Sequence, residues 1–374
     1  MKNSYLDKKN SLDVVNDDIN FILDSCKDEL KKMKGSSLLV TGGAGFLGYY
    51  FIQTIIGWND ISKKESNINL YILDNFSRGM PAWLEKFKSK KNIKILNQSI
   101  LDPLPEYLSN IDYIIHAASI ASPIYYRKNP IATMDANVNG LRNILDLSIS
   151  KFKDIKSILY FSTSEIYGDP PDDQIPTKES YRGNVSCTGP RACYDESKRY
   201  GETLCVNFAS QFDLPVKIAR PFNNYGPGLK ITDGRALPDF ARNIINKKNI
   251  VLLSDGSPTR TFCYVADSII GYLKILILGK NGESYNIGTE KPEISMLELA
   301  QKCINLGKDV LDIDVGLDFL KSSDKNYLVD NPNRRCPDIS KAKKELGYAP
   351  KISIDEGIKN SLLWYADNKN SQEA

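Results

Sequence analysis

The sequence predicts an α/β protein built on a doubly wound parallel sheet, with a smaller mixed α/β domain toward the C-terminus. Two observations lead to this fold class. From Ser36 onward, short apolar runs alternate with longer stretches of helical periodicity, which is typical of βα units. After Arg220 this alternation gives way to a segment rich in glycine and proline, followed by further helical stretches.

Short apolar runs predict the strands of the sheet, at residues 38–41, 70–73, 93–97, 113–116, 157–162 and 216–220. Helical patterns lie between them, at 49–56, 132–150 and 197–212. Because successive βα units place their helices on both faces of a parallel sheet, the expected architecture is of the Rossmann type. Further helices are expected near 239–247, 296–306 and 354–368, in a lobe that covers the carboxyl end of the sheet.

The same patterns predict how the chain divides into domains. Residues 13–34 carry apolar side chains at helical spacing, so the polar N-terminal extension should contain an amphipathic helix that packs on the body or on a partner subunit. The expected parts are an extension at 1–35, a Rossmann domain at 36–220 with a returning segment at about 262–290, and a smaller domain at 221–261 and 291–374.

A glycine-rich turn joins the first predicted strand to the first predicted helix. Gly42 permits a tight turn, Gly45 lets the backbone approach a pyrophosphate, and Gly48 lets the helix pack closely on the strand. Asp74 ends the second strand and is placed to accept hydrogen bonds from the adenosine ribose. The segment therefore predicts a dinucleotide site that prefers NAD to NADP, although the nearby Arg78 weakens that preference. A βα turn without a ligand is the alternative.

Composition excludes several functional classes. The net charge of +3 and the dispersed basic residues give no reason to expect nucleic acid as a partner. No apolar stretch is long enough to span a membrane, and the N-terminus is too charged for a signal peptide. Seven cysteines without a C-x-x-C pair favour reduced thiols in a cytoplasmic protein. The single histidine, His116, excludes a zinc site built from several histidines and a Ser-His-Asp arrangement that uses a second histidine, and a strand-end role near the cofactor is its simplest interpretation.

A second group of residues suggests proton transfer. Tyr194 and Lys198 are four residues apart, so they share one face of a helix. A nearby ammonium favours the phenolate that a general base requires. Thr163 and Glu165 follow a predicted strand at its carboxyl end, where α/β folds place their chemistry. Surface pairing of Tyr194 with Lys198, and a solvated loop acid at 165, are the alternatives.

The chain from about residue 36 to 367 resembles the extended short-chain dehydrogenase/reductase superfamily, also called the NAD-dependent epimerase/dehydratase superfamily. Within it, the likeness is greatest to the UDP-glucuronate decarboxylases, or UDP-xylose synthases. The segments that carry the resemblance are 163–165, 189–196 with Lys198, 121–123 with 129–130, 222–223 with 225–227, 233–235 and 335–339.

This resemblance implies roles for individual residues. Thr163, Tyr194 and Lys198 would form the oxidoreductase triad, and Glu165 with Arg335 would form the pair that distinguishes decarboxylases. Ser164 is a secondary catalytic candidate, and Arg334 competes with Arg335. Besides the glycines, Asp74 and the triad, the implied cofactor contacts are Phe46, Leu47, Asn75, Arg78, Ser99, Ile100, Ala117 and Ala118. The implied substrate contacts are Ser122, Pro123, Tyr125, Asn223, Arg235, Arg260 and Tyr264, with no metal ligand among them.

The resemblance also implies an activity. The expected reaction is NAD-dependent decarboxylation of UDP-glucuronate through a 4-keto intermediate, giving UDP-xylose or a UDP-4-keto-pentose, in a homodimer. A nucleotide-sugar 4,6-dehydratase is an alternative, but an Asp-Glu pair would then be expected where this chain has Ser164 and Glu165. A 4-epimerase needs no glutamate there. An NAD-binding regulatory or scaffold protein is the alternative outside enzymes, and it would not require the triad.

Overall fold

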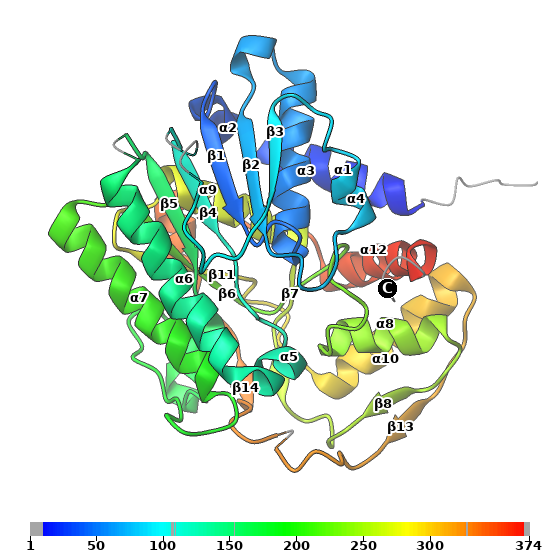
Figure 1. The fold of residues 1–374 in the computed structure, drawn as a ribbon. Coiled ribbons are helices and arrows are strands. Elements are labelled where there is room, and N and C mark those ends of the chain that lie inside the picture. The colour runs from blue at the N-terminus through cyan, green and yellow to red at the C-terminus, as the bar shows by residue number, and fades with distance from the viewer. Residues whose placement is uncertain (1–9, 106–107, 109, 153, 327, 370–374) are drawn as a thin grey trace, which may run out of the picture.

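The structure, a computed structural model, describes residues 10–105, 108, 110–152, 154–326 and 328–369. Its centre is a parallel sheet with the strand order β11-β6-β5-β4-β1-β2-β3 (Figure 1). The strands are β1 (Ser37–Thr41), β2 (Asn69–Asp74), β3 (Ile93–Asn97), β4 (Tyr113–His116), β5 (Ser157–Phe161), β6 (Val216–Pro221) and β11 (Ser284–Ile287). This confirms the predicted fold class and all six predicted strands.

The outer strand β11 comes from a later part of the chain than the other six strands of the sheet. It pairs in parallel with β6, where Tyr285 lies opposite Ala219. Helix α9 (Val265–Leu278) precedes it and packs against β5, β6 and β11. The chain therefore returns to the sheet after it has left for the second lobe.

Helices cover both faces of the sheet. On one face, α6 (Pro130–Ser150) and α7 (Ala192–Phe212) lie side by side and bury Leu141, Ile144 and Cys205 against the strands (Figure 1). On the other face lie α3 (Phe46–Ile61) and α9. Short helices connect the units: α4 (Ala82–Glu85), α5 (Pro123–Lys128) and the 3-10 helices η1 (Lys64–Ser66), η2 (Ser164–Tyr167) and η3 (Asp172–Gln174).

The second lobe, at the lower right of Figure 1, is built from helices and short strand pairs. Its helices are α8 (Ala236–Ile245), α10 (Met296–Leu311) and α12 (Ile354–Asp367), and its strands are β7 (Asn224–Tyr225), β8 (Ile250–Leu252), β9 (Thr259–Arg260), β10 (Cys263–Tyr264), β12 (Ile294–Ser295), β13 (Leu317–Phe319) and β14 (Arg334–Arg335). Helix α11 (Ser340–Leu346) comes from the same part of the chain but packs on α9 and β11 of the sheet domain. A capping box formed by Ser295 and Glu298 fixes the start of α10. Strand β14 runs beside β9, which places Arg335 next to Arg260.

The N-terminal extension packs on the body of the molecule. Helix α1 (Ser11–Ser25) begins with a capping box formed by Asn10 and Asp13, and α2 (Lys27–Lys32) follows it. Helix α1 contacts α3 and α9 of the sheet domain and also α12 of the second lobe. Its buried Asp18 accepts hydrogen bonds from the hydroxyls of Tyr50 (2.6 Å) and Tyr264 (2.7 Å). One helix thus joins both lobes on the side where α3 and α12 meet.

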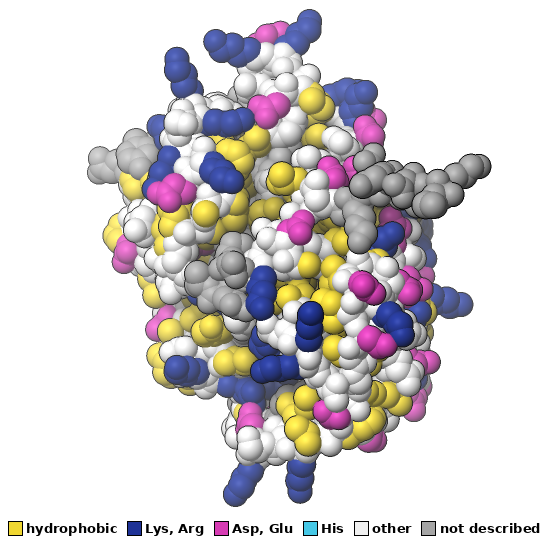
Figure 2. Space-filling view, turned by 90° about the vertical axis from the view of Figure 1, so that its right-hand side faces the viewer, with side chains coloured by type: hydrophobic (Ala, Val, Ile, Leu, Met, Phe, Trp, Pro, Cys, Tyr) yellow, Lys and Arg dark blue, Asp and Glu magenta, His cyan; other side chains and the backbone are white. Residues whose placement is uncertain are grey.

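The molecular surface carries both signs of charge. On the face shown in Figure 2, lysine and arginine side chains are scattered among acidic and apolar ones. Among the described residues, no helix is both long and apolar enough to cross a bilayer.

Candidate functional site

A cleft of about 1390 Å³ lies between the carboxyl ends of the strands and the second lobe. Clefts for a single small ligand measure roughly 300–1,000 Å³, so this one has room for two ligands side by side. Nearly all of the residues predicted from the sequence line it: Gly42, Gly45, Phe46, Leu47, Gly48, Asp74, Asn75, Arg78, Ser99, Ile100, Ala117, Ala118, Ser122, Pro123, Tyr125, Thr163, Ser164, Glu165, Tyr194, Lys198, Asn223, Arg235, Arg260 and Arg335.

Tyr264 is the exception, and its predicted substrate contact is wrong. The residue is fully buried, and its hydroxyl donates to Asp18 of the N-terminal helix at 2.7 Å. Because β10 directs this side chain toward α1 rather than into the cleft, Tyr264 joins the two lobes and has no access to a ligand.

The glycine turn leaves an open cradle at the start of α3. Gly42 has φ +69°, and a Cβ atom there would come within 2.7 Å of the Ala118 backbone. A Cβ on Gly48 would lie 2.3 Å from the carbonyl oxygen of Gly43. Gly45 is the N-cap residue and offers no side-chain hydrogen bond to the helix. The first N–H groups of α3 are therefore free to meet phosphate oxygens, so the residues present fit a dinucleotide.

Asp74 stands at the end of β2, as the sequence predicts. Its two carboxylate oxygens accept backbone N–H bonds from Ala44 (3.0 Å) and Phe76 (2.9 Å). Burial raises the pKa of Asp74, and these two bonds oppose that effect. The guanidinium of the neighbouring Arg78 lies 4.6 Å from the centre of the Tyr125 ring and 3.7 Å from a carboxylate oxygen of Asp233. Asp74 therefore places a carboxylate where a ribose bound in the turn would lie.

Helix α7 begins at Ala192, five residues earlier than the sequence predicts, and so includes both Tyr194 and Lys198. The ammonium of Lys198 donates to the carbonyl oxygen of Phe161 at 2.8 Å and lies 5.9 Å from the Tyr194 ring centre. Burial lowers the pKa of Lys198 to about 7. Burial also raises the pKa of Tyr194 to about 12, opposed chiefly by Arg235 and by a hydrogen bond from Thr163.

These shifts differ from the expectation that Lys198 lowers the pKa of Tyr194. The difference has a physical reason: the cleft dehydrates both groups, and the ammonium is directed at a backbone oxygen instead of the phenol. Arg235 is the cation that most favours a phenolate in this structure. Ionisation of Tyr194 therefore depends on positive charge that lies in the cleft. It depends also on helix α7, which places the phenol there.

Glu165 lies between two arginines. Both terminal nitrogens of the Arg335 guanidinium donate to its carboxylate, Nη2 at 2.6 Å and Nη1 in a shorter contact. Nη2 of Arg191 donates to the same carboxylate. Burial alone would raise the pKa of Glu165, but the two arginines hold it at about 2. Glu165 is thus ionised at neutral pH, and two arginines fix its position from two sides.

The remaining predicted residues border the far end of the cleft. Arg235 donates to the carbonyl oxygen of Ala121 at 3.2 Å, and its Nε lies 3.2 Å from Asp233. Asn223 donates to the Thr261 carbonyl oxygen at 2.8 Å. Nη1 of Arg260 donates to the carbonyl oxygens of Thr259 (2.7 Å) and Asn333 (3.0 Å). This end of the cleft is cationic and suits a diphosphate.

Sequence reasoning missed two residues that line the same cleft. Arg191 belongs to the segment 189–196 that carries the family resemblance, but an arginine at this position does not by itself indicate a contact with Glu165. Tyr126 stacks on Tyr194 with ring centres 5.0 Å apart and planes within 9°. Tyr126 directly follows the implied substrate contact Tyr125, and the sequence pattern does not show which of the two adjacent tyrosines faces the cleft.

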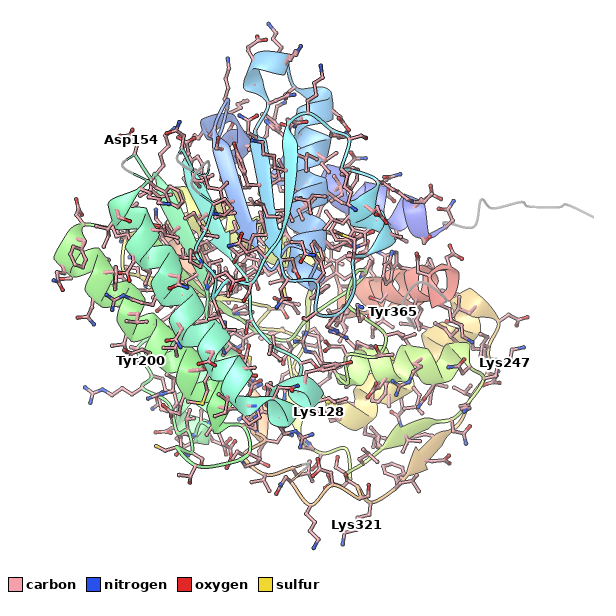
Figure 3. All side chains as sticks on the ribbon, in the orientation of Figure 1. Lys128, Asp154, Tyr200, Lys247, Lys321 and Tyr365 are labelled. Carbon is pink, nitrogen blue, oxygen red and sulfur yellow. The ribbon has the colours of Figure 1, made fainter. Side chains whose placement is uncertain are left out.

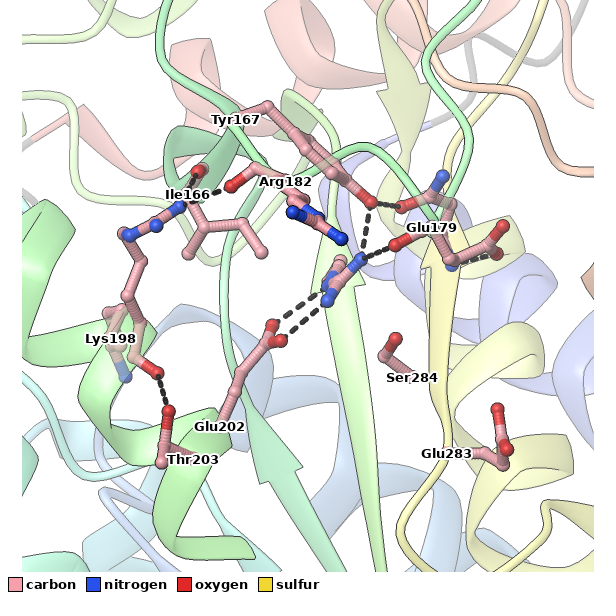
Figure 4. A network of polar contacts seen from close by, with 12 residues as sticks. Ile166, Tyr167, Glu179, Arg182, Lys198, Glu202, Thr203, Glu283 and Ser284 are labelled. Atoms are coloured by element: carbon pink, nitrogen blue, oxygen red, sulfur yellow. Dashed lines mark hydrogen bonds and ion pairs between the residues drawn. The ribbon is translucent and has the colours of Figure 1, made fainter. Parts of the chain in front are cut away.

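A polar network behind the cleft was also missed (Figure 4). The guanidinium of Arg220, at the end of β6, binds Glu202 of α7 through Nε (2.8 Å) and Nη2 (2.5 Å). Its Nη1 donates to the hydroxyl of Tyr167 at 2.7 Å, which in turn donates to Asn286. Since Glu202 is one helical turn beyond Lys198, the network fixes α7 against the sheet and against η2.

His116 is a structural residue at the end of β4. Its Nδ1 is 2.8 Å from the hydroxyl of Thr41, and burial, followed by the charge of Lys198, lowers its pKa to about 3. It is therefore neutral at physiological pH. Within the described ranges, no three His, Cys, Asp or Glu side chains gather in a way that could hold a metal ion.

A doubly wound sheet with an open glycine turn, and a tyrosine and lysine on the helix facing it, define a dinucleotide-dependent oxidoreductase scaffold. The chain belongs to the NAD dependent epimerase/dehydratase family, whose model matches residues 38–288.

Curated relatives extend this likeness over most of the chain. The chain is 37% identical to UDP-glucuronic acid decarboxylase 1 of Arabidopsis thaliana over 322 residues, which cover 86% of this chain and 68% of the relative. It is 34% identical to UDP-glucuronic acid decarboxylase 1 of Danio rerio over 330 residues, 88% of this chain and 72% of the relative. Among solved structures, DesIV, the dTDP-glucose 4,6-dehydratase of Streptomyces venezuelae with NAD and TYD bound, is 25% identical with a TM-score of 0.74, covering 89% and 98% of the two chains.

Proposed function

We propose that this protein is an NAD-dependent nucleotide-sugar decarboxylase that converts UDP-glucuronate to UDP-xylose. The observation that carries the proposal is the bidentate contact of Arg335 with Glu165 in the same cleft as Thr163, Tyr194 and the glycine turn. Relatives at 34–37% identity are named UDP-glucuronic acid decarboxylases, which supports the same substrate for this chain.

NAD, when bound to the glycine turn, supplies the oxidant for C4 of the sugar and later the hydride that returns to C4. Tyr194 takes the proton of the C4 hydroxyl, while Thr163 hydrogen-bonds to the same oxygen and fixes its direction. The 4-ketone lies β to the C6 carboxylate. The C5–C6 bond then breaks, carbon dioxide leaves, and the electron pair passes through C5 to the ketone oxygen.

The enolate formed in this way takes up a proton at C5, and Tyr194 returns its proton to the C4 oxygen at the end. Arg335 would hold the C6 carboxylate before the bond breaks, because its planar fork matches a carboxylate. Glu165, ionised under all working conditions, would orient the water that supplies the C5 proton. It does not supply that proton itself.

The contacts also weigh against the alternatives. A 4,6-dehydratase would need an acid where this chain has Ser164, and that hydroxyl is a poor acid. A 4-epimerase has no use for a buried carboxylate held by two arginines. A scaffold protein would not need the Tyr194 and Lys198 pair in the cleft.

The deciding experiment is incubation of the protein with UDP-glucuronate and NAD, with detection of carbon dioxide and of the pentose nucleotide. We expect equal amounts of both products. Tyr194→Phe should abolish turnover while leaving the affinity for NAD within about twofold, because the ring and its stacking on Tyr126 remain. Turnover of a hexose nucleotide without carbon dioxide would show that decarboxylation is the wrong assignment.

We also propose a homodimer formed through α6 and α7. Apolar side chains exposed on these helices support it: Ile131, Met134, Ile149, Tyr200, Val206 and Phe212. Figure 3 labels Tyr200 on α7. Tyr200→Glu should shift the protein to monomers in sedimentation, and an unchanged mass would contradict the proposal. A cytoplasmic location stays a prediction, supported by seven unpaired cysteines.

A further inference from the structure

Charged side chains form a continuous row beside the reacting end of the cleft. Arg335 contacts Glu165, Glu165 contacts Arg191, and Nε of Arg191 lies 3.6 Å from Oδ2 of Asp195. All four side chains are largely buried, with 5% to 18% of their surface exposed. Positive and negative groups alternate along the row, so a change at one position alters the partners of the next.

This row poses a problem for an acidic substrate. The guanidinium of Arg335 is already engaged by Glu165 through two hydrogen bonds. A sugar carboxylate that approaches Arg335 must share this guanidinium, and it meets the negative charge of Glu165 at the same time. A second cation on Glu165 removes both difficulties, because it neutralises the glutamate while Arg335 turns to the substrate.

We propose that Arg191 is this second cation and that it determines the selectivity of the cleft for sugar nucleotides that carry a carboxylate at C6. The proposal rests on the proposed function, since it assumes that Arg335 receives the sugar carboxylate. Arg191 contacts Glu165 and would act on the substrate through that carboxylate, so in this proposal it is a positioning residue.

The placement of Arg191 suits this role. It is the N-cap residue of α7, and its carbonyl oxygen accepts the backbone N–H groups of Tyr194 (2.9 Å) and Asp195 (3.1 Å). Its guanidinium lies 6.0 Å from the centre of the Tyr126 ring. The backbone of Arg191 is therefore fixed to the same helix that carries the base, and its guanidinium lies beside Tyr126 and Glu165.

Of its two carboxylate neighbours, Arg191 supports Glu165 more strongly. It contacts Glu165 directly, whereas it reaches Asp195 only at 3.6 Å. Burial, followed by the charge of Glu165, raises the pKa of Asp195 to about 7, while the pKa of Glu165 stays at about 2. Asp195 therefore contacts Arg191 only weakly, and the guanidinium stays bound to Glu165.

The test compares two ligands that differ only at C6. Dissociation constants for UDP-glucuronate and UDP-glucose are measured by calorimetry for the wild-type protein, Arg191→Gln and the control Arg334→Gln. Arg334 neighbours Arg335 but pairs with Glu293 and Asp172 outside the cleft. We expect Arg191→Gln to weaken UDP-glucuronate about 10- to 100-fold, the range for charge-assisted hydrogen bonds, and UDP-glucose by less than about threefold. Arg334→Gln should change neither.

Equal losses for both ligands would overturn the inference, because they would show a general structural role for Arg191. Unchanged selectivity would overturn it as well. If Arg191→Gln does not fold, the double variant Arg191→Gln/Asp195→Asn removes the adjacent unpaired carboxylate and is judged by the same two affinities. A wild-type protein that binds UDP-glucose as tightly as UDP-glucuronate would instead count against the proposed function.

Discussion

The ion pair between Arg220 and Glu202 offers a direct test of the packing behind the cleft. Only 10% and 13% of the two side chains are exposed, and two hydrogen bonds join them. Glu202→Gln keeps the shape of the side chain but removes its charge. The guanidinium of Arg220 then remains buried with only neutral partners, among them the hydroxyl of Tyr167 (Figure 4).

Removing one partner of a buried ion pair costs about 3–5 kcal/mol. Because glutamine can still accept one hydrogen bond, we expect the lower end, about 3 kcal/mol. Unfolding entropy is about 2.1 cal/mol/K per residue, or about 0.8 kcal/mol/K for this chain of 374 residues. The melting temperature should therefore fall by about 4 °C.

The assay is thermal unfolding followed by circular dichroism, with Glu196→Gln as the matched control on the same helix. Glu196 pairs with Arg199 at 3.6 Å, and both side chains are more than one-third exposed. Such surface pairs contribute at most about 1 kcal/mol, so the control should lose about 1 °C or less. Equal melting temperatures for the two variants would refute the view that Glu202 anchors α7.

Three other expectations follow from single residues. Gly48→Ala places a Cβ 2.3 Å from a backbone oxygen, so calorimetry should detect no NAD binding; an unchanged affinity would mean that the cofactor lies elsewhere. Asp74→Ala should reduce the preference for NAD over NADP in paired affinity measurements, and a constant ratio would assign ribose recognition to another group. The pKa of His116 is about 3 in the folded chain and about 6.5 when unfolded, so the unfolded state binds more protons between these values and stability falls as the pH is lowered. This one group should cost about 2 kcal/mol between pH 7 and pH 5, and a chemical-denaturation series in which His116→Asn shows the same slope as the wild type would contradict it.

Local pattern was sufficient for the sheet. All six predicted strands are present because each is a short apolar run that ends at a polar or glycine residue. Helix α9 was not recognised, because most of its residues are buried and a helix that is apolar on every side has no amphipathic period. The start of α7 was placed too late, since the five residues 192–196 (Ala-Cys-Tyr-Asp-Glu) are too few and too mixed to show a helical apolar period.

Of the site, the residues at strand ends and on the glycine turn could be predicted from local pattern, while the pairing of Glu165 with Arg335 was implied only by the family resemblance. Glu165 and Arg335 are 170 residues apart, and their contact needs β14 to lie beside β9. The error at Tyr264 has the same origin, since its partner Asp18 is 246 residues away. The prediction assigned Tyr264 by resemblance of segment, which carries no information about its contact with the N-terminal helix.

Helix α1 has a practical consequence for anyone who shortens this chain. The family match begins at residue 38, which invites truncation just before β1. Such a truncation would strip Val15, Ile19 and Ile22 from the faces they cover and would leave the phenols of Tyr50 and Tyr264 without their shared acceptor. If the shortened protein aggregates, or if its two lobes no longer pack together, the cause would be the loss of helix α1. Such a result would say nothing about catalysis.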